Sequence, residues 1–298
     1  MLLVLQRLST FYIFLLLGWI LGKFKKELIS QTGVISFLLV NLLLPCKVFA
    51  NFSKNFTTDY FLHNGTSLIF SLVLLALLHF VCKYPAKLLT KDSFERKVYE
   101  YSVVISNYAY LGYPLAEAIF GSQGLTDLVL FCIPFAVYTN TYGYVKLSGG
   151  GMSIKKLFNP ITLSILLGAV FGLLQIQLPS VITQPISSAS ACVGPLSMLL
   201  TGLTLSAMAP KALVTDGKAY LFVALRLVGV PALVFALCKV FGLSQILPSA
   251  LFMAIMPTGL NPIIFAQHGG QSPALGAKLA FLSHLFSVIT IPIWLMLV

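Results

Sequence analysis

Long apolar runs separated by short polar stretches make up most of the sequence. The runs are continuous and about 20 residues long, the length of a helix that crosses a bilayer. They lack the alternation over about 10 residues that a transmembrane β-barrel requires. The pattern predicts an all-α polytopic membrane protein with ten transmembrane helices, spans 1 to 10, at 4–22, 33–52, 62–82, 98–120, 125–146, 159–177, 186–208, 218–241, 248–268 and 275–297.

Composition agrees with this assignment. Of the 298 residues, 58% are hydrophobic and only 9% are charged, whereas a soluble domain has roughly 25% charged residues. Ten spans use about 200 residues, so little of the chain is left for a soluble domain. The net charge of +11 would point to nucleic acid in a soluble protein. Here it indicates membrane orientation, and no nucleic-acid partner is expected.

Lysine and arginine are unevenly distributed between the two sets of loops. The loops that follow odd-numbered spans hold about 14 of them, and the opposite side has only Arg7, Lys54 and Lys239. The positive-inside rule places the first set in the cytoplasm. We therefore expect an integral protein of the cell membrane with both termini on the non-cytoplasmic side. Whether the outward Asn-x-Ser/Thr triplets carry glycans is left open; they begin at Asn51, Asn55 and Asn64.

The two halves of the chain resemble each other at a spacing of about 150 residues. Residues 15–22 align with residues 165–172 without a gap, and Pro45 of span 2 aligns with Pro195 of span 7. Each half has five spans, an odd number, so the second half must be inverted relative to the first. The predicted units are a first five-helix repeat, 1–147, and an inverted second repeat, 155–298, an arrangement typical of secondary transporters.

Spans 4 and 9, which correspond in the two halves, each carry Asn, Gly and Pro near their centres. Helix breakers are tolerated in hydrocarbon only where protein buries them or they line a cavity. Two ordinary proline kinks are the alternative, but the paired occurrence favours two broken, crossing helices that form a binding site. The predicted break residues are Gly112, Pro114, Pro257, Gly259 and Pro262.

A helix that begins at the membrane midplane directs free amides and the positive end of its dipole toward that point. A carboxylate is the natural ligand for such a site. Asn261 and Pro262 are typical of an N-cap and a first helical position, and Pro114 is expected to begin the second half of span 4. The predicted substrate contacts are Asn107, Tyr108, Tyr113, Thr258 and Asn261.

Three ionisable residues within the spans are candidates for charge balance: Lys47, Arg226 and Glu117. Lys47 either faces a pocket or extends to the outward headgroups. Arg226 is expected to pair or to contact carbonyl groups. Glu117 is a proton carrier, an outer gate residue or a solvated carboxylate.

Metal, cofactor and catalytic sites are not expected. His79, His268 and His284 lack ligand spacing, the five cysteines are scattered singly, and hydrolase, metalloprotease and nucleotide-binding motifs are missing. The sequence therefore does not indicate an enzyme.

The broken spans resemble those of the auxin efflux carrier family, the PIN-like carriers of plants and their bacterial relatives. The segment from Ser106-Asn107 through Gly112-Tyr113-Pro114-Leu115 to Phe120-Gly121 is similar to the span 4 motif of the family. Residues 257–266 are similar to its span 9 motif. Arg226-Leu227 with Pro231, and Asn159-Pro160 at the start of span 6, also fit.

The resemblance implies a carrier whose broken helices cross at the substrate site. A scaffold of spans 1, 2, 6 and 7, often a homodimer interface, holds a domain of spans 3–5 and 8–10 that moves by an elevator mechanism. Family substrates are small carboxylates such as malate, malonate or auxin. Tyr108 and Tyr113 replace smaller or aliphatic family residues, which implies a narrower pocket or phenol hydroxyls offered to the ligand.

We therefore predict a secondary transporter of small organic anions, with no cofactor and with a carboxylate and the lipid bilayer as its partners. Two alternatives are kept open. One is a membrane sensor that uses the same fold to bind a ligand without moving it. The other is a sodium-coupled symporter of the bile-acid type, which should show carboxylates clustered near the broken helices.

Overall fold

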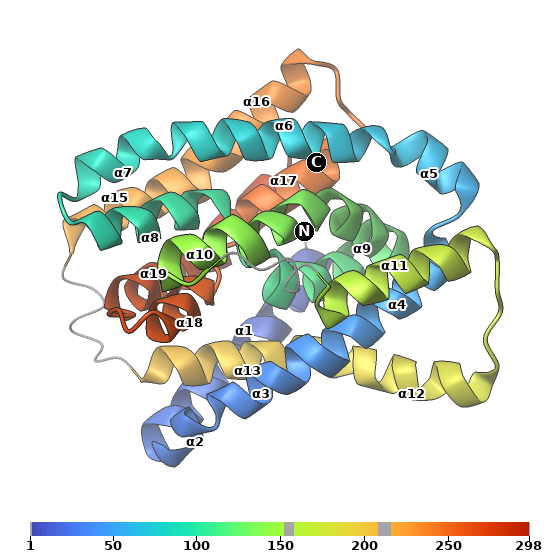
Figure 1. The fold of residues 1–298 in the computed structure, drawn as a ribbon, viewed down its shortest axis with the longest axis horizontal. Coiled ribbons are helices and arrows are strands. Elements are labelled where there is room, and N and C mark those ends of the chain that lie inside the picture. Colours follow the sequence, from blue (N-terminus) through green and yellow to red (C-terminus); the bar gives the residue numbers. More distant parts are fainter. Residues whose placement is uncertain (1, 152–157, 208–215, 298) are drawn as a thin grey trace.

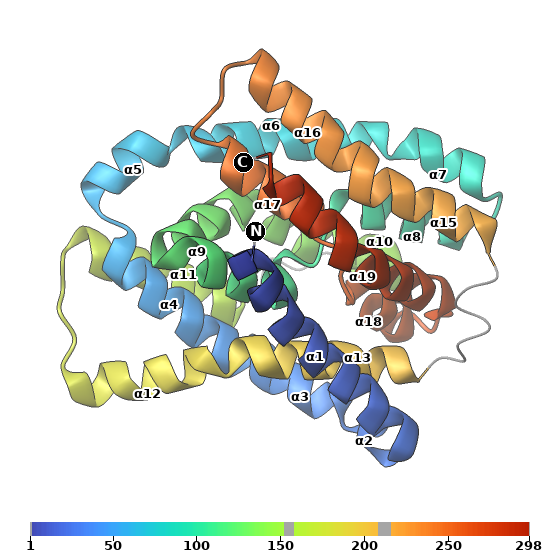
Figure 2. The same ribbon diagram turned by 180° about the vertical axis from the view of Figure 1, so that it is seen from behind.

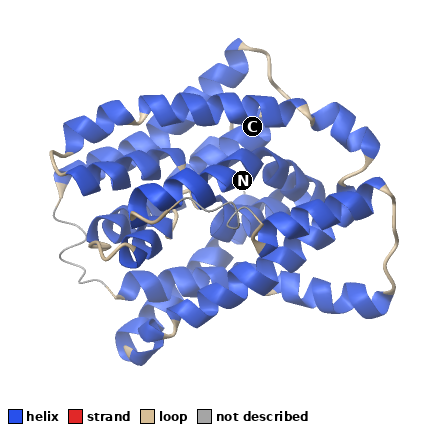
Figure 3. Ribbon diagram, in the orientation of Figure 1, coloured by secondary structure: helices blue, strands red, loops and turns tan. Residues whose placement is uncertain are grey.

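The computed structural model describes residues 2–151, 158–207 and 216–297, and every named element within these ranges is a helix (Figure 1, Figure 3). The expected all-α class is confirmed for this part of the chain. Seven helices or runs of consecutive helices are long and apolar enough to cross a membrane. The predicted ten spans also include the shorter apolar helix α11 (Pro160–Leu173) and the interrupted spans 4 and 9, so the number ten stays a prediction.

In the first half, several predicted spans consist of consecutive helical segments joined by single wide π-helical turns, labelled η. The segments are α1 (Leu2–Phe24), α2 (Glu27–Ser30), α3 (Thr32–Leu38), η1 (Leu39–Leu43), α4 (Leu44–Asn55), α5 (Thr58–Asn64), α6 (Thr66–Val81), α7 (Lys83–Leu89), α8 (Ser93–Val104), η2 (Tyr108–Gly112), α9 (Tyr113–Tyr138), η3 (Thr139–Gly143) and α10 (Tyr144–Ser148).

The second half continues in the same way after α11. Its segments are α12 (Ser180–Ala191), α13 (Val193–Ser206), α15 (Gly217–Ala224), η5 (Leu225–Gly229), α16 (Val230–Val240), α17 (Leu247–Ile255), α18 (Asn261–His268) and α19 (Ala274–Leu295).

The π-helical turn η2 is followed by Pro114, and the helix continues through this proline because a side chain replaces the missing hydrogen bond. Pro114 has no amide hydrogen, so the carbonyl of Tyr110, four residues earlier, loses its usual helical donor. The hydroxyl of Ser197 on α13 donates to that carbonyl at 2.7 Å. A distant helix thus supplies the hydrogen bond that the local sequence cannot provide.

Predicted spans 4 and 5 meet at Gly121. Helical hydrogen bonding runs through α9 as one element, but Gly121 has φ 72° and ψ −170°, so the chain changes direction there. Glycine adopts this positive φ without the steric cost that a side chain would add. The residue therefore separates the outer part of span 4 from span 5.

Two helix pairs pack with their backbones nearly in contact: α1 against α13, and α4 against α11 (Figure 1, Figure 2). A Cβ atom added at Gly202 would lie 2.0 Å from the carbonyl oxygen of Leu15, and one added at Gly172 would lie 2.5 Å from that of Phe56. Small residues permit this close approach, which is a main source of helix association in membranes.

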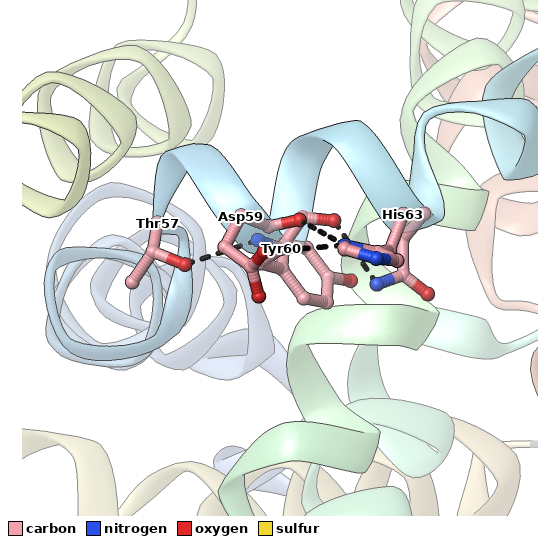
Figure 4. A network of polar contacts seen from close by, with 5 residues as sticks. Thr57, Asp59, Tyr60 and His63 are labelled. Atoms are coloured by element: carbon pink, nitrogen blue, oxygen red, sulfur yellow. Dashed lines mark hydrogen bonds and ion pairs between the residues drawn. The ribbon is translucent and has the colours of Figure 1, made fainter.

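A short helix, α5, follows predicted span 2 and is held by polar contacts (Figure 4). The Thr57 hydroxyl oxygen caps it by accepting from the amide of Tyr60 at 3.0 Å, and His63 Nδ1 lies 2.8 Å from the carbonyl oxygen of Asp59. The Tyr60 hydroxyl donates to the Asp127 carboxylate at 2.7 Å. This last bond ties α5 to α9 and so fixes the connection between predicted spans 2 and 3.

The α1–α13 contact predicts a sharp difference between two alanine substitutions. Gly202→Ala should lower the stability of the protein by roughly 1–3 kcal/mol, because its Cβ overlaps the α1 backbone. Gly33→Ala on α3, where a Cβ meets nothing within 4 Å, should be neutral or slightly stabilising, because alanine favours helix. Thermal unfolding of the two purified variants in detergent tests this. Equal melting temperatures would contradict the described packing.

Candidate functional site

The first interruption lies between α8 and η2. Ile105 is extended (φ −105°, ψ 123°), and Asn107 has φ −81° and ψ 48°. The helix resumes at Tyr108, ahead of the predicted start at Pro114. Gly112 lies within this new helix, where its amide donates to the carbonyl of Asn107 at 3.0 Å. The break is therefore located at 105–107, not at the glycine and proline expected from the sequence.

The second interruption lies between α17 and α18. Met256 is extended (φ −66°, ψ 143°), and Leu260 is the N-cap of α18. Asn261 is therefore not the cap that its position before Pro262 predicted. Its side-chain amide instead donates to the Tyr101 hydroxyl on α8 at 3.0 Å. Pro262 lies in the first turn, where a missing amide hydrogen costs nothing.

The two interruptions cross and hydrogen-bond to each other. Ser106 and Thr258 form an isolated antiparallel bridge, and the amide of Asn107 donates to the carbonyl of Pro257 at 2.7 Å. The Ser106 hydroxyl donates to the carbonyl of Met253, in the last turn of α17, at 2.9 Å. Each break thus supplies partners for buried backbone groups that the other leaves free.

Helix α19 holds both interruptions from one side. The amide of Thr258 donates to Ser283 Oγ at 3.0 Å. The side-chain amide of Asn107 lies 3.0 Å from His284 Nε2, and His284 Nδ1 lies 2.7 Å from the carbonyl oxygen of Ala280. The crossing is therefore fixed to the final helix of the chain through two side chains one residue apart.

Arg226 stabilises the end of α17. The side chain is fully buried, and its guanidinium donates to the carbonyl of Ala254 at 2.6 Å. A cation at a helix C-terminus interacts favourably with the helix dipole. Carbonyl contact was one of the two roles expected from the sequence. Arg226 does not line the cavity described next, so this placement does not support charge balance for a ligand there.

A cavity of about 220 Å³ lies against the crossing. One wall comes from the crossing itself, with Asn107, Tyr108, Gly259 and Asn261. Its other lining residues come from the α3–α4 run, from α11, from η3 and from α18. Within the described residues, no Asp, Glu, Lys, Arg or His lines it. These other lining residues include Ser36, Val40, Leu44, Thr139, Asn140, Ile161, Ile264 and Phe265.

Several predicted site residues lie outside this cavity wall. Tyr113 is buried with its ring centroid 5.8 Å from that of Tyr108, and the hydroxyl of Thr258 lies 2.8 Å from Ser283 Oγ. The predicted break residues Gly112, Pro114, Pro257 and Pro262 do not line it either.

Lys47 and Glu117 form an ion pair with each other. The Lys47 side chain is 4% exposed and that of Glu117 is 41% exposed, so Lys47 does not extend to the headgroups and Glu117 is not a free carboxylate. Both line a second cavity of about 180 Å³, farther along α4 and α9, together with Pro114 and Pro195. They do not line the cavity at the crossing.

Sequence reasoning missed three groups around the crossing: His284, Tyr101 and Thr139. His284 was considered only as a metal ligand, although a histidine within a span is itself a signal of function. Tyr101 and Thr139 carry no comparable signal, because tyrosine and threonine are common in membrane helices. Their relevance follows only from their distant partners.

The sequence matches a family whose description is membrane transport protein, over residues 3–156 and 149–295. A transporter of Methanocaldococcus jannaschii, described as uncharacterized, is 27% identical over 298 residues, covering 92% of this chain and 91% of the relative. An uncharacterized transporter of Methanothermobacter thermautotrophicus is 28% identical over 200 residues, covering 65% of each chain.

The family match extends over nearly the whole chain, and the two motifs that carried the resemblance form the crossing itself. These findings confirm the family that the motifs predicted. The protein is an integral membrane protein, and it belongs to the auxin efflux carrier family of membrane transport proteins.

Proposed function

We propose that the protein is a secondary transporter that binds a small carboxylate at the crossing and moves it by alternating access. The observation that carries the proposal is that two half-helices begin at one hydrogen-bonded crossing and border one cavity. The first-turn amides of a helix have no partner within the helix, and the helix dipole favours a negative ligand there.

The chemistry of the wall favours one carboxylate attached to a small apolar or aromatic body. Asn107 and Asn261 supply amide groups, and Tyr108 supplies a hydroxyl, whereas Val40 and Phe265 are apolar. Within the described residues, the wall offers no cation to balance a second negative charge. Auxin-like monocarboxylates therefore fit the wall better than malate or malonate, which stay candidates within the same substrate class.

The proposed architecture is ten spans in two inverted repeats. Gly18 and Gly22 of α1 contact α13, and Gly168 and Gly172 of α11 contact α4. These two glycine pairs occupy equivalent places in the aligned segments 15–22 and 165–172. Each half also contributes one interruption to the crossing. Equivalent positions thus make equivalent close contacts, as an inverted repeat requires.

We infer an elevator movement of spans 3–5 and 8–10 against spans 1, 2, 6 and 7. The Lys47–Glu117 ion pair joins these two groups at the outward end of the predicted topology, and the Tyr12 hydroxyl lies 2.5 Å from Ser287 Oγ across the same boundary. Such contacts are expected to open when the moving domain travels. We also propose that two copies of the chain form a homodimer through spans 1, 2, 6 and 7, which do not move.

Two alternatives predict different behaviour. A sensor on this fold binds carboxylates without accumulating them inside vesicles. A sodium-coupled symporter needs carboxylates near the breaks, but within the described residues no Asp or Glu lines the cavity, and Glu117 is paired with Lys47. Uptake into liposomes with sodium or with potassium separates all three.

Asn107→Leu should reduce carboxylate uptake at least tenfold, because it removes the amide at the crossing and leaves a polar ligand unpaired. The assay is uptake of radiolabelled indole-3-acetate and malonate into proteoliposomes, corrected for protein-free vesicles. Asn41→Leu is the matched control: Asn41 is exposed and donates to the carbonyl of Phe37 within its own helix. Normal transport by Asn107→Leu would remove span 4 from the site.

Breaking the Lys47–Glu117 ion pair should open the second cavity to the outside more often. We expect Lys47→Met to raise the labelling rate of Phe11→Cys, a buried position that lines that cavity, by about fivefold, since a partly exposed pair contributes roughly 1 kcal/mol. The measurement uses a membrane-impermeant thiol reagent with Cys192 replaced by alanine.

Exchanging the two charges provides the control for this experiment. Lys47→Glu combined with Glu117→Lys should restore slow labelling, because the pair re-forms with reversed polarity. Fast labelling in the exchanged variant, or no change in Lys47→Met, would rule out the ion pair as the outward closure.

A further inference from the structure

The cavity at the crossing poses an electrostatic problem for the proposed function, on which this inference rests. A carboxylate that enters it meets amides, hydroxyls and apolar groups, but within the described residues no cationic side chain lines the wall. An unbalanced charge in a low-dielectric site is costly, and proteins usually pair or neutralise it. A positive charge close behind the wall would therefore add to the two helix dipoles in stabilising the carboxylate.

His284 is a group behind the wall that can acquire such a charge. It is 2% exposed and contacts Asn107, which does line the cavity. Its Nδ1 atom lies 2.7 Å from the carbonyl oxygen of Ala280. A carbonyl can only accept, so Nδ1 carries a hydrogen in every protonation state, and Nε2 is the atom that gains or loses a proton.

The 3.0 Å contact between His284 Nε2 and the side-chain amide of Asn107 then has two states. When the imidazole is neutral, Nε2 accepts from the NH₂ group of Asn107, and the amide oxygen is free to turn toward the cavity. When Nε2 is protonated, it needs an acceptor, so the amide must rotate by about 180° and present its oxygen to the histidine. The NH₂ group is then free to donate to a ligand in the cavity.

These two states differ in what they offer a carboxylate. In the neutral state the Asn107 amide oxygen faces the cavity and repels the carboxylate. In the protonated state the Asn107 NH₂ group faces the cavity as a donor, with the positive charge of His284 behind it. Proton binding and carboxylate binding therefore favour each other, and the coupling is reciprocal.

The other titratable groups near α19 are not placed to take up this proton. Within the described residues, the packed helices α13 and α17 carry no titratable side chain. On η5, Arg226 donates to the carbonyl of Ala254 and is always protonated, so it cannot take up a proton. On α1, Tyr12 contacts Ser287. Helix α8 presents Tyr101, bound to Asn261. The remaining charged or titratable groups on the packed helices include Arg7, Lys23, Glu95, Arg96, Lys97, Tyr99, Glu100, Lys218, Tyr220, His268 and, on α19 itself, Lys278.

We propose that His284 takes up one proton on Nε2 when a carboxylate binds at Asn107, so that substrate and proton cross the membrane together. The proton comes from the water on the side to which the cavity is open, and it leaves to water on the other side after the carboxylate has dissociated. A monocarboxylate then moves without net charge.

Calorimetric titration of the purified full-length protein tests the proposal. Indole-3-acetate and malonate are titrated near neutral pH in phosphate and in Tris, whose ionisation enthalpies differ. The difference in heat gives the number of protons taken up per ligand. We expect close to one for the native protein, close to zero for His284→Gln, and no change for His79→Gln, the matched control. His79 lies on α6 and contacts Tyr138.

The possible outcomes separate this inference from the proposed function. If neither carboxylate binds to the native protein, the carboxylate site itself is wrong. If one binds without proton uptake, or if His284→Gln still takes up a proton, the coupling role of His284 is overturned while the site stands. Nitrogen NMR of the ¹⁵N-histidine-labelled native protein measures the protonation of His284 directly. It therefore tests the proposal even if His284→Gln does not fold. His284 should be an Nδ1–H tautomer when free and doubly protonated when the carboxylate is bound.

Discussion

Every buried backbone donor and acceptor in the middle of a bilayer needs a partner within the protein, and this constraint explains the crossing. Two helices stop near their centres, and each leaves amides or carbonyls that hydrocarbon cannot satisfy. The amide of Asn107 donates to Pro257, and the Ser106 hydroxyl donates to Met253. An unsatisfied buried group costs about 1–3 kcal/mol, so either break alone would be strongly unfavourable.

Side chains from other helices satisfy further backbone carbonyls, at the end of α17 and in η5. Arg226 donates to the carbonyl of Ala254 at the end of α17. The indole of Trp294 donates at 2.9 Å to the carbonyl of Leu227. This carbonyl lacks its helical donor because Pro231, four residues later, has no amide hydrogen. The site is therefore a product of the whole assembly, and its backbone is held in place before a ligand arrives.

How far the sequence predicts the molecule depends on the range of the interactions involved. Hydropathy locates the helices because burial in lipid acts on each segment separately, and the paired Asn, Gly and Pro residues identify the two interrupted spans. The sequence prediction placed the first break too close to Pro114. Ser197 supports the helix through that proline by donating to the carbonyl of Tyr110, from which it is 87 residues away. The partners of Lys47 and His284 lie 70 and 177 residues away, and no local pattern encodes them.

The most direct test of the account is a cross-link between the two interruptions. Ser106 and Thr258 form an antiparallel pair, and the bond from Asn107 to Pro257 makes them a non-hydrogen-bonded pair, whose Cα atoms are typically about 4.5 Å apart. Ser106→Cys with Thr258→Cys, in a background without the five native cysteines and with a protease site inserted after Gly151, should form a disulfide on oxidation. The two halves should then migrate together after cleavage and separate on reduction. Halves that separate without reduction would show that the breaks do not cross.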